Sequence, residues 1–150
     1  MVNKVNSQLK TKKRVSDYGE VFTHEREVNG MLDLVKNETE RLDSRFLEPA
    51  CGTGNFLVEV LNRKLLALKL KYMKSQPEYE KYGVIVISSL YGVDLLEDNV
   101  LECRQRLLRV FEKLCRNFSI TKRECWEILF LLKEVGFVEI VPFHGIKLNK

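Results

Sequence analysis

Apolar residues recur along this chain at helical spacing, in segments separated by short apolar runs, and this pattern is typical of an α/β protein. A helix is predicted from residue 55 to the break at Gln76-Pro77, with an apolar face made of Leu57, Leu61, Leu65 and Leu68. A second long helix should begin at residues 97–98, with a buried stripe made of Val100, Leu101, Leu107, Leu108, Phe111, Leu114 and Phe118.

Two short apolar segments, residues 45–48 and 90–94, are predicted strands, and Pro49 ends the first because it has no N–H for a ladder. The resulting β-α-β-α order predicts parallel strands with a ligand at their carboxyl ends. Between them, residues 79–82 are expected to be a polar connector, and residues 84–87 fit either a strand or a helix end. Upstream, Thr23 is expected to cap a helix with one face made of Val28, Met31, Leu32 and Val35.

Residues 119–150 are expected to form a helix followed by a β-hairpin. A capped helical pattern ends at Gly136, and two short apolar segments then flank a turn at residues 142–145. Helix plus hairpin is similar to the second half of a winged-helix DNA-binding module. A small packing appendage or the product of a rearranged gene explains the pattern equally well.

Composition is consistent with one domain. The chain has 150 residues, 45% of them hydrophobic, which is enough for one core. Its apolar runs are too short to span a bilayer, and the N-terminus is polar rather than a signal sequence. The four cysteines show no Cys-x-x-Cys spacing and no nearby histidine, so we expect no metal site and reduced thiols in a cytoplasmic protein.

The formal charge of +4 is modest, but the basic residues cluster. Residues 1–14 contain five Lys and Arg and no acid, and residues 104–123 contain seven against Glu112 alone. Each run is by itself consistent with a solvated helix face or a polar tail. Contact with DNA phosphates becomes the favoured interpretation for at least one of them if other features indicate a DNA enzyme.

The candidate ligand site is the sequence FLEPACGTGNF at residues 46–56, where a strand runs into a Gly-x-Gly turn and then a helix. Glycine lets the backbone turn tightly and approach a ligand, and the helix start directs unpaired N–H groups toward it. Gly54 is followed by Asn55-Phe56, so the third glycine of dinucleotide sites and the Lys-Ser/Thr pair of triphosphate sites are both absent. The pattern favours a nucleoside ligand without a phosphate chain.

Residues 48–56 resemble motif I of S-adenosylmethionine-dependent DNA methyltransferases, in the form typical of adenine-N6 enzymes. Residues 19–24, followed by Val28 and Met31, resemble motif X, and residues 90–94 resemble motif II. The three motifs appear in the family's order. The resemblance implies a partial Rossmann-like methyltransferase fold at residues 19–118, between a basic segment at 1–18 and the appendage at 119–150.

The resemblance also implies roles for single residues. Gly52 and Gly54 would let the main chain pass the methionine part of S-adenosylmethionine, Glu48 would face its ammonium group, and Asp94 would hold its ribose. Asp94 lies 40 positions after Gly54, further than is usual, and we attribute the gap to an inserted basic segment at residues 61–82. The full predicted cofactor set is Phe22, Thr23, Glu48, Pro49, Ala50, Cys51, Gly52, Gly54 and Asp94.

Alternatives stay open at three of these residues. Glu48 could brace the loop instead of facing the ligand. Phe22 and Thr23 could be a core aromatic beside a helix cap.

The motif that captures the target base is missing. Adenine-N6 enzymes hold the flipped base with an Asn/Asp-Pro-Pro-Tyr/Phe motif, whereas the three prolines here are isolated at positions 49, 77 and 142. We therefore identify no catalytic residue and expect a truncated or split enzyme that acts with DNA and with a second methyltransferase or specificity chain. The alternatives are a non-catalytic DNA- or partner-binding module that retains the fold, and a fragment of an RNA or protein methyltransferase.

Overall fold

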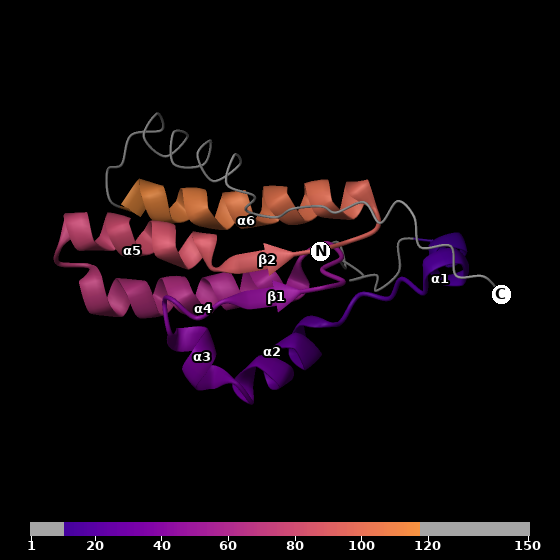
Figure 1. Cartoon of the computed structure of the whole chain (residues 1–150), viewed down its shortest axis with the longest axis horizontal. Coiled ribbons are helices and arrows are strands. Elements are labelled where there is room, and N and C mark those ends of the chain that lie inside the picture. Colours follow the sequence, from indigo (N-terminus) through magenta and orange to yellow (C-terminus); the bar gives the residue numbers. More distant parts are fainter. Residues whose placement is uncertain (1–10, 118–150) are drawn as a thin grey trace, which may run out of the picture.

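The computed structural model describes residues 11–117, and this part of the chain is a mixed α/β structure that is mostly helical (Figure 1). In chain order the elements are α1 (Lys12–Tyr18), α2 (Glu25–Asp33), α3 (Lys36–Glu40), β1 (Phe46–Glu48), α4 (Asn55–Tyr72), α5 (Gln76–Ser88), β2 (Leu90–Gly92) and α6 (Glu97–Asn117). The predicted appendage at 119–150 and the first ten residues of the basic segment lie outside the described residues.

The two strands pair in parallel, as the β-α-β order predicts, with Leu47 opposite Tyr91 in the register. Both strands are shorter than predicted: β1 lacks Arg45, and β2 ends at Gly92, two residues before Asp94. In Figure 1 both arrows point toward the end of the molecule where α1 lies. That end is where a ligand is expected, because it holds the carboxyl ends of both strands.

The crossover between the strands consists of two helices, α4 and α5, rather than one. Residues 79–82, expected to be a polar connector, belong to α5, where Tyr79 is fully buried. The polar connector prediction was wrong because α4 already ends at Tyr72, and Pro77 lies in the first turn of the next helix, where its missing N–H costs nothing. Residues 84–87 accordingly lie in a helix.

Helix α4 buries the predicted face of leucines and also a lysine. Lys64 has no exposed surface, and its Nζ donates to the carbonyl of Ser44 and, at 2.6 Å, to Oγ of Ser89. Desolvation lowers the pKa of Lys64 to about 8. The side chain therefore ties α4 to the segments that precede both strands.

Two predicted helix faces are narrower than expected. Val28 and Leu32 of α2 are buried, but Met31 in the same helix is exposed. Val35 is exposed as well, because α2 ends at Asp33 and the chain then turns into α3. The stripe of α6 is buried at Val100, Leu107 and Phe111, partly buried at Leu108 and exposed at Leu101. For Leu114 and Phe118 the prediction lies outside the described side chains.

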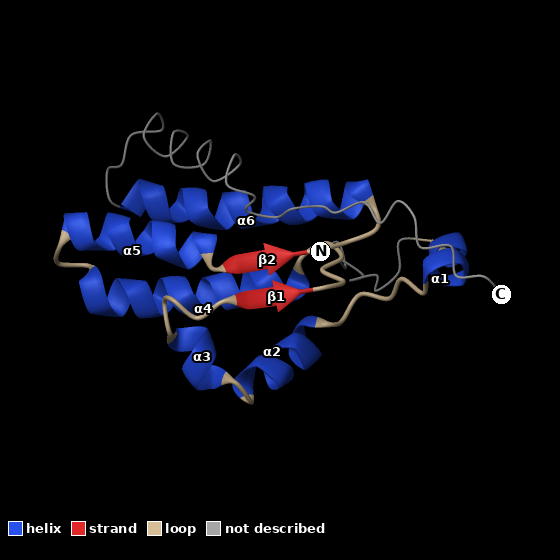
Figure 2. Cartoon of the chain, in the orientation of Figure 1, coloured by secondary structure: helices blue, strands red, loops and turns tan. Residues whose placement is uncertain are grey.

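Only one face of the sheet is covered by helices within the described residues. Helix α4 packs on both strands and α5 packs on β2, and Figure 2 shows the strands in front of α4. Leu90 is buried on the covered face, whereas Leu47 and Tyr91 on the opposite face are 66% and 38% exposed.

Candidate functional site

The glycine turn connects β1 directly to α4. Gly52 and Gly54 have φ values of +50° and +87°, a region that favours glycine. The Cys51 amide donates to Val93 O at 2.8 Å, and the Gly54 amide donates to Cys51 O at 2.8 Å. Helix α4 then begins at Asn55, as the sequence predicts.

Asp94 lies beside this turn. Its Oδ2 accepts a hydrogen bond from the Gly52 amide at 2.8 Å, and its Oδ1 accepts one from the Leu96 amide at 2.9 Å. The structure thus brings the acid that follows β2 and the turn that follows β1 into direct contact. Part of the capacity of this carboxylate to accept hydrogen bonds is used within the protein.

Gly54 is glycine for a different reason from the one the motif implies. A Cβ at this position would lie 2.5 Å from Sγ of Cys103 on α6, so Gly54 allows the turn to pack against that helix. Gly54 is not among the residues that line the cavity at the site. The close approach of α6, rather than of a ligand, is the constraint observed here.

Residues 19–23 form a wall opposite the turn. The Phe22 ring lies next to Gly52, where an added Cβ would be 3.1 Å from Cε1 of Phe22. The side chain of Asn55 holds the backbone of Thr23, because Asn55 Nδ2 donates a hydrogen bond to Thr23 O at 2.9 Å.

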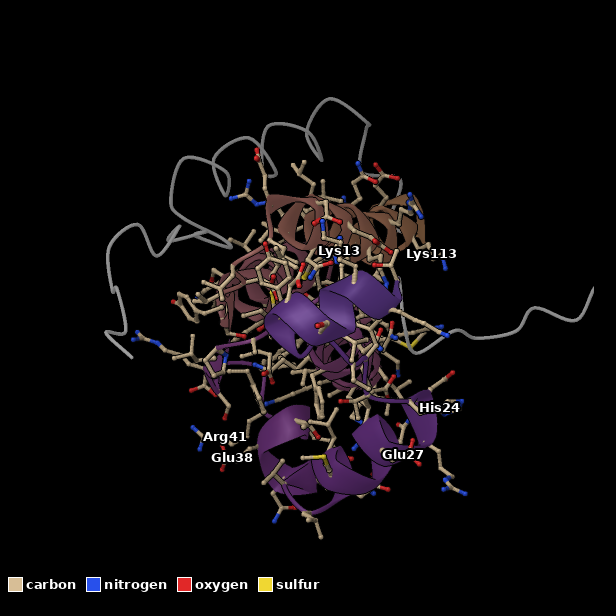
Figure 3. All side chains as sticks on the ribbon, turned by 90° about the vertical axis from the view of Figure 1, so that its right-hand side faces the viewer. Lys13, His24, Glu27, Glu38, Arg41 and Lys113 are labelled. Carbon is tan, nitrogen blue, oxygen red and sulfur yellow. The ribbon has the colours of Figure 1, made fainter. Side chains whose placement is uncertain are left out.

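Thr23 does not cap α2, contrary to the prediction. His24 is the cap instead, and its Nδ1 accepts a hydrogen bond from the Arg26 amide. Figure 3 shows His24 near Glu27 at the surface at the start of α2, and Nδ1 lies 3.7 Å from a Glu27 carboxylate oxygen. His24 therefore has a structural role.

A cavity of about 300 Å³ lies between the turn, residues 18–23 and the segment that follows β2. Its volume is at the lower end of the range for small-molecule sites. The predicted cofactor residues that line it are Phe22, Thr23, Glu48, Pro49, Ala50, Cys51, Gly52 and Asp94. Three separate segments of the sequence thus meet at the carboxyl ends of the strands.

Two ionisable groups in the cavity have raised pKa values. Desolvation raises the pKa of Glu48 above its ordinary value. The Cys51 thiol has a raised pKa because of its hydrogen bond with Cys103 and its burial. Cys51 is therefore a protonated thiol that packs under the turn rather than a nucleophile.

Sequence reasoning missed a group of polar residues on α6 and around it. Arg106 Nη1 donates to Thr53 O and to Asn55 Oδ1, both at 2.7 Å, and Asn99 lines the cavity. Asn99, Cys103 and Arg106 are spaced i, i+4, i+7, so they share the side of α6 that faces the turn. This periodicity of small and polar residues is the signal that could have revealed them.

These contacts also revise the interpretation of the basic runs. Arg106 is used within the turn, and Arg14 pairs with Glu20 and Asp98, so neither side chain is available for DNA phosphates in this structure. Arg109 and Lys113 on α6 are exposed. Among the described residues of the second run, these two exposed side chains and the half-buried Arg104 are the candidates for phosphate contact.

A curated relative supports part of the resemblance. The chain is 29% identical, over 119 residues, to a protein of Methanocaldococcus jannaschii provisionally named a type II restriction enzyme and methyltransferase. The match covers 76% of this chain and 10% of the relative, so the chain spans about a tenth of the relative's length. The likeness supports a relationship to restriction-modification methyltransferases, but it does not address adenine-N6 specificity or cofactor binding.

Other comparisons give no match. No protein-family model matches the chain, and no solved structure matches it significantly. Within residues 11–117, no helix is long and apolar enough to cross a membrane, and no group of His, Cys, Asp and Glu side chains could hold a metal ion.

Proposed function

We propose that this chain is the S-adenosylmethionine-binding part of a site-specific DNA adenine-N6 methyltransferase. One observation carries the proposal: a single cavity at the carboxyl ends of two parallel strands collects every predicted cofactor residue except Gly54. Parallel α/β sheets bind ligands at this edge. The resemblance of the sequence around the turn identifies the ligand class.

The side chains of the cavity suit this cofactor. Glu48 is a partly buried carboxyl group whose negative form would be stabilised by the ammonium of the methionine part. Oδ2 of Asp94 accepts one protein hydrogen bond and retains capacity for a ribose hydroxyl. When bound, S-adenosylmethionine supplies a methyl group on a positively charged sulfur.

The residues of this chain would bind and orient the cofactor, and another part of the enzyme would hold the base. The cofactor would supply the methyl group that is transferred to adenine N6, and the N6 proton would be released to solvent. Orientation of the two reactants supplies much of such a rate enhancement. We propose that a second methyltransferase or specificity segment provides the base-capturing motif and that DNA contacts both parts.

One face of the sheet is uncovered within residues 11–117, and this is consistent with a further segment or chain packing there. All-parallel sheets are normally covered on both faces, yet Leu47 and Tyr91 are exposed here. Among the described residues, β1 also has an open edge. Phe46 N donates to Ser89 O and Val93 N donates to Glu48 O, so the backbone groups of the intervening Leu47 point away from β2. A parallel strand added there would end beside Glu48 at the cavity.

Isothermal titration calorimetry with S-adenosylmethionine tests the proposal. The chain should bind with a micromolar dissociation constant, and Asp94→Asn should weaken binding about 10- to 150-fold through loss of a charge-assisted hydrogen bond. Asp17→Asn, at an exposed position on α1, is the matched control and should leave affinity unchanged. A folded chain that binds no S-adenosylmethionine would contradict the proposal and favour a non-catalytic DNA- or partner-binding module.

A methylation assay then tests the reaction and its substrate. The chain is mixed with a candidate partner that carries the Asn-Pro-Pro-Tyr motif, and transfer of labelled methyl groups to DNA, RNA and protein is compared. N6-methyladenine in digested DNA is the expected product. Transfer to RNA or protein alone would favour the alternative methyltransferase class.

A further inference from the structure

We infer that Asn99 is a positioning residue that joins both walls of the cavity through one buried side-chain amide. Asn99 is 1% exposed and lies in the first turn of α6. The inference rests on the proposed function for its effect on cofactor affinity, but its structural consequence can be measured without any ligand.

The amide group of Asn99 makes contacts in three directions. Its Nδ2 donates to Glu20 Oε1 at 2.6 Å and to Asp94 Oδ1 at 3.2 Å, and its Oδ1 accepts from Arg14 Nη2 at 3.2 Å. These partners come from residues 19–23, from the segment after β2 and from α1. Because Asp94 in turn accepts from the Gly52 amide, a continuous polar chain runs from α1 to the glycine turn.

Charge explains why an amide is required at this position. Asn99 lies between two carboxylates, those of Glu20 and Asp94, and its two N–H groups give each of them a donor. Arg14 offsets the charge of Glu20, with Nη2 2.8 Å from Oε1, and it also pairs with Asp98. A side chain with only acceptors at position 99 would place them against the carboxylates of Glu20 and Asp94. This region is poorly hydrated, and unpaired charge there is costly.

The contact with Asp94 gives Asn99 its effect on the cofactor site. Asp94 Oδ1 is held by Asn99 and the Leu96 amide, which leaves Oδ2 directed at Gly52 and the cavity. The contact with Glu20 keeps residues 19–23 against the opposite side. Asn99 therefore sets the orientation of the proposed ribose ligand and the position of the wall that contains Phe22.

Amide hydrogen exchange of the ligand-free chain tests this inference with two substitutions. Asn99→Ala removes the bridge, and Asn99→Asp keeps its shape but replaces the donor by a carboxyl group. Both should accelerate exchange of the Gly52 amide about tenfold or more, because Asp94 Oδ1 then keeps only its bond from the Leu96 amide and the carboxylate is held less firmly against Gly52. Gln105→Ala, on an exposed position of α6, is the control and should leave this rate unchanged.

Calorimetry with S-adenosylmethionine gives a second measurement that a merely structural role would not reproduce. Asn99→Ala should weaken binding about tenfold and Asn99→Asp more than that at pH 7.5. The ratio of the Asn99→Asp and wild-type dissociation constants should fall toward one at pH 5, because protonation of the introduced carboxyl group restores a donor. The charged groups around that position are Arg14, Glu20, Asp94 and Asp98, so three of the four raise its pKa.

The outcomes separate this inference from the proposed function. Unchanged Gly52 exchange in both variants overturns the inference whether or not the wild type binds the cofactor. The wild type binding the cofactor, with the dissociation constants of both variants within twofold of the wild-type value at every pH, overturns the inference. The proposed function then stands. If Gly52 exchange is faster in the Asn99 variants but the wild-type chain binds no cofactor, the bridge is supported and the proposed function is contradicted.

Discussion

The Gly52 amide and the Asp94 carboxylate are joined by a hydrogen bond of 2.8 Å across the carboxyl ends of β1 and β2. The acid that the sequence predicts to bind a ribose therefore also holds the turn that borders the cavity. A substitution at Asp94 will therefore affect both the turn and any ligand that Asp94 binds. The stability of the chain measured without ligand reports on the turn alone.

Asp94→Asn should lower the free energy of unfolding by about 1–3 kcal/mol without any ligand, because one carboxylate oxygen that accepts a backbone N–H becomes a donor. Urea unfolding followed by circular dichroism measures this change. Glu48→Gln is the comparison at the same cavity. It should leave stability at pH 7 unchanged or slightly higher, since burial already disfavours the charged form of Glu48.

Cofactor affinity should decrease on acidification because of Glu48. Its pKa is raised by desolvation, so the carboxylate that would face the ammonium becomes neutral at a higher pH than an ordinary glutamate. Titrations with S-adenosylmethionine from pH 7.5 to pH 5 should show a progressive loss of affinity. Glu48→Gln should bind more weakly at pH 7.5 and show a flatter profile, whereas identical profiles would remove Glu48 from the ammonium site.

Gly54→Ala should lower stability by at least about 2 kcal/mol, because it combines a positive φ with a methyl group 2.5 Å from Cys103 Sγ. Thermal unfolding of a double-mutant cycle with Cys103→Ala measures the steric part. The second substitution should recover part of the loss, and additive effects would contradict the packing explanation. Gly30→Ala is the matched control; its position in α2 has open space around it, so it should be neutral or stabilising.

The stability of the chain should rise between pH 8 and pH 10.5 because of Lys64. In this range the unfolded lysine is protonated while the buried one, with a pKa of about 8, is neutral. The unfolded state then binds more protons, so raising the pH favours the folded state, by roughly 3 kcal/mol over the range. Urea unfolding of Lys64→Met should show this rise removed, whereas Lys69→Met, at an exposed position of α4, should retain it.

The local features of the site could be predicted from the sequence because they depend on neighbouring residues. The glycines, the strand before them and the apolar face of α4 indicate a strand-turn-helix unit without reference to the rest of the chain. Helix α5 was missed because Pro77 can end a helix or begin one, and tertiary burial of Tyr79 favours the second.

The polar contacts of the site depend on positions far apart in the sequence. Asn99 meets Glu20 only once α6 and residues 19–23 are folded against each other, and the spacing of either segment gives no information about that contact. Lys64 was similarly hidden in a lysine-rich helix, where charge predicts exposure. The motifs were thus enough to predict a cofactor class, whereas the residues that hold the cavity in shape became visible only in the structure.

The exposed side chains of Leu47 and Tyr91 affect how the protein should be produced. Within residues 11–117 the short parallel sheet has an open edge, and such an edge is a template for unwanted pairing between copies at high concentration. We expect soluble yield to increase when the chain is co-expressed with a polypeptide that donates a strand beside Leu47. The chain purified alone should stay monomeric best at low concentration and over short storage times.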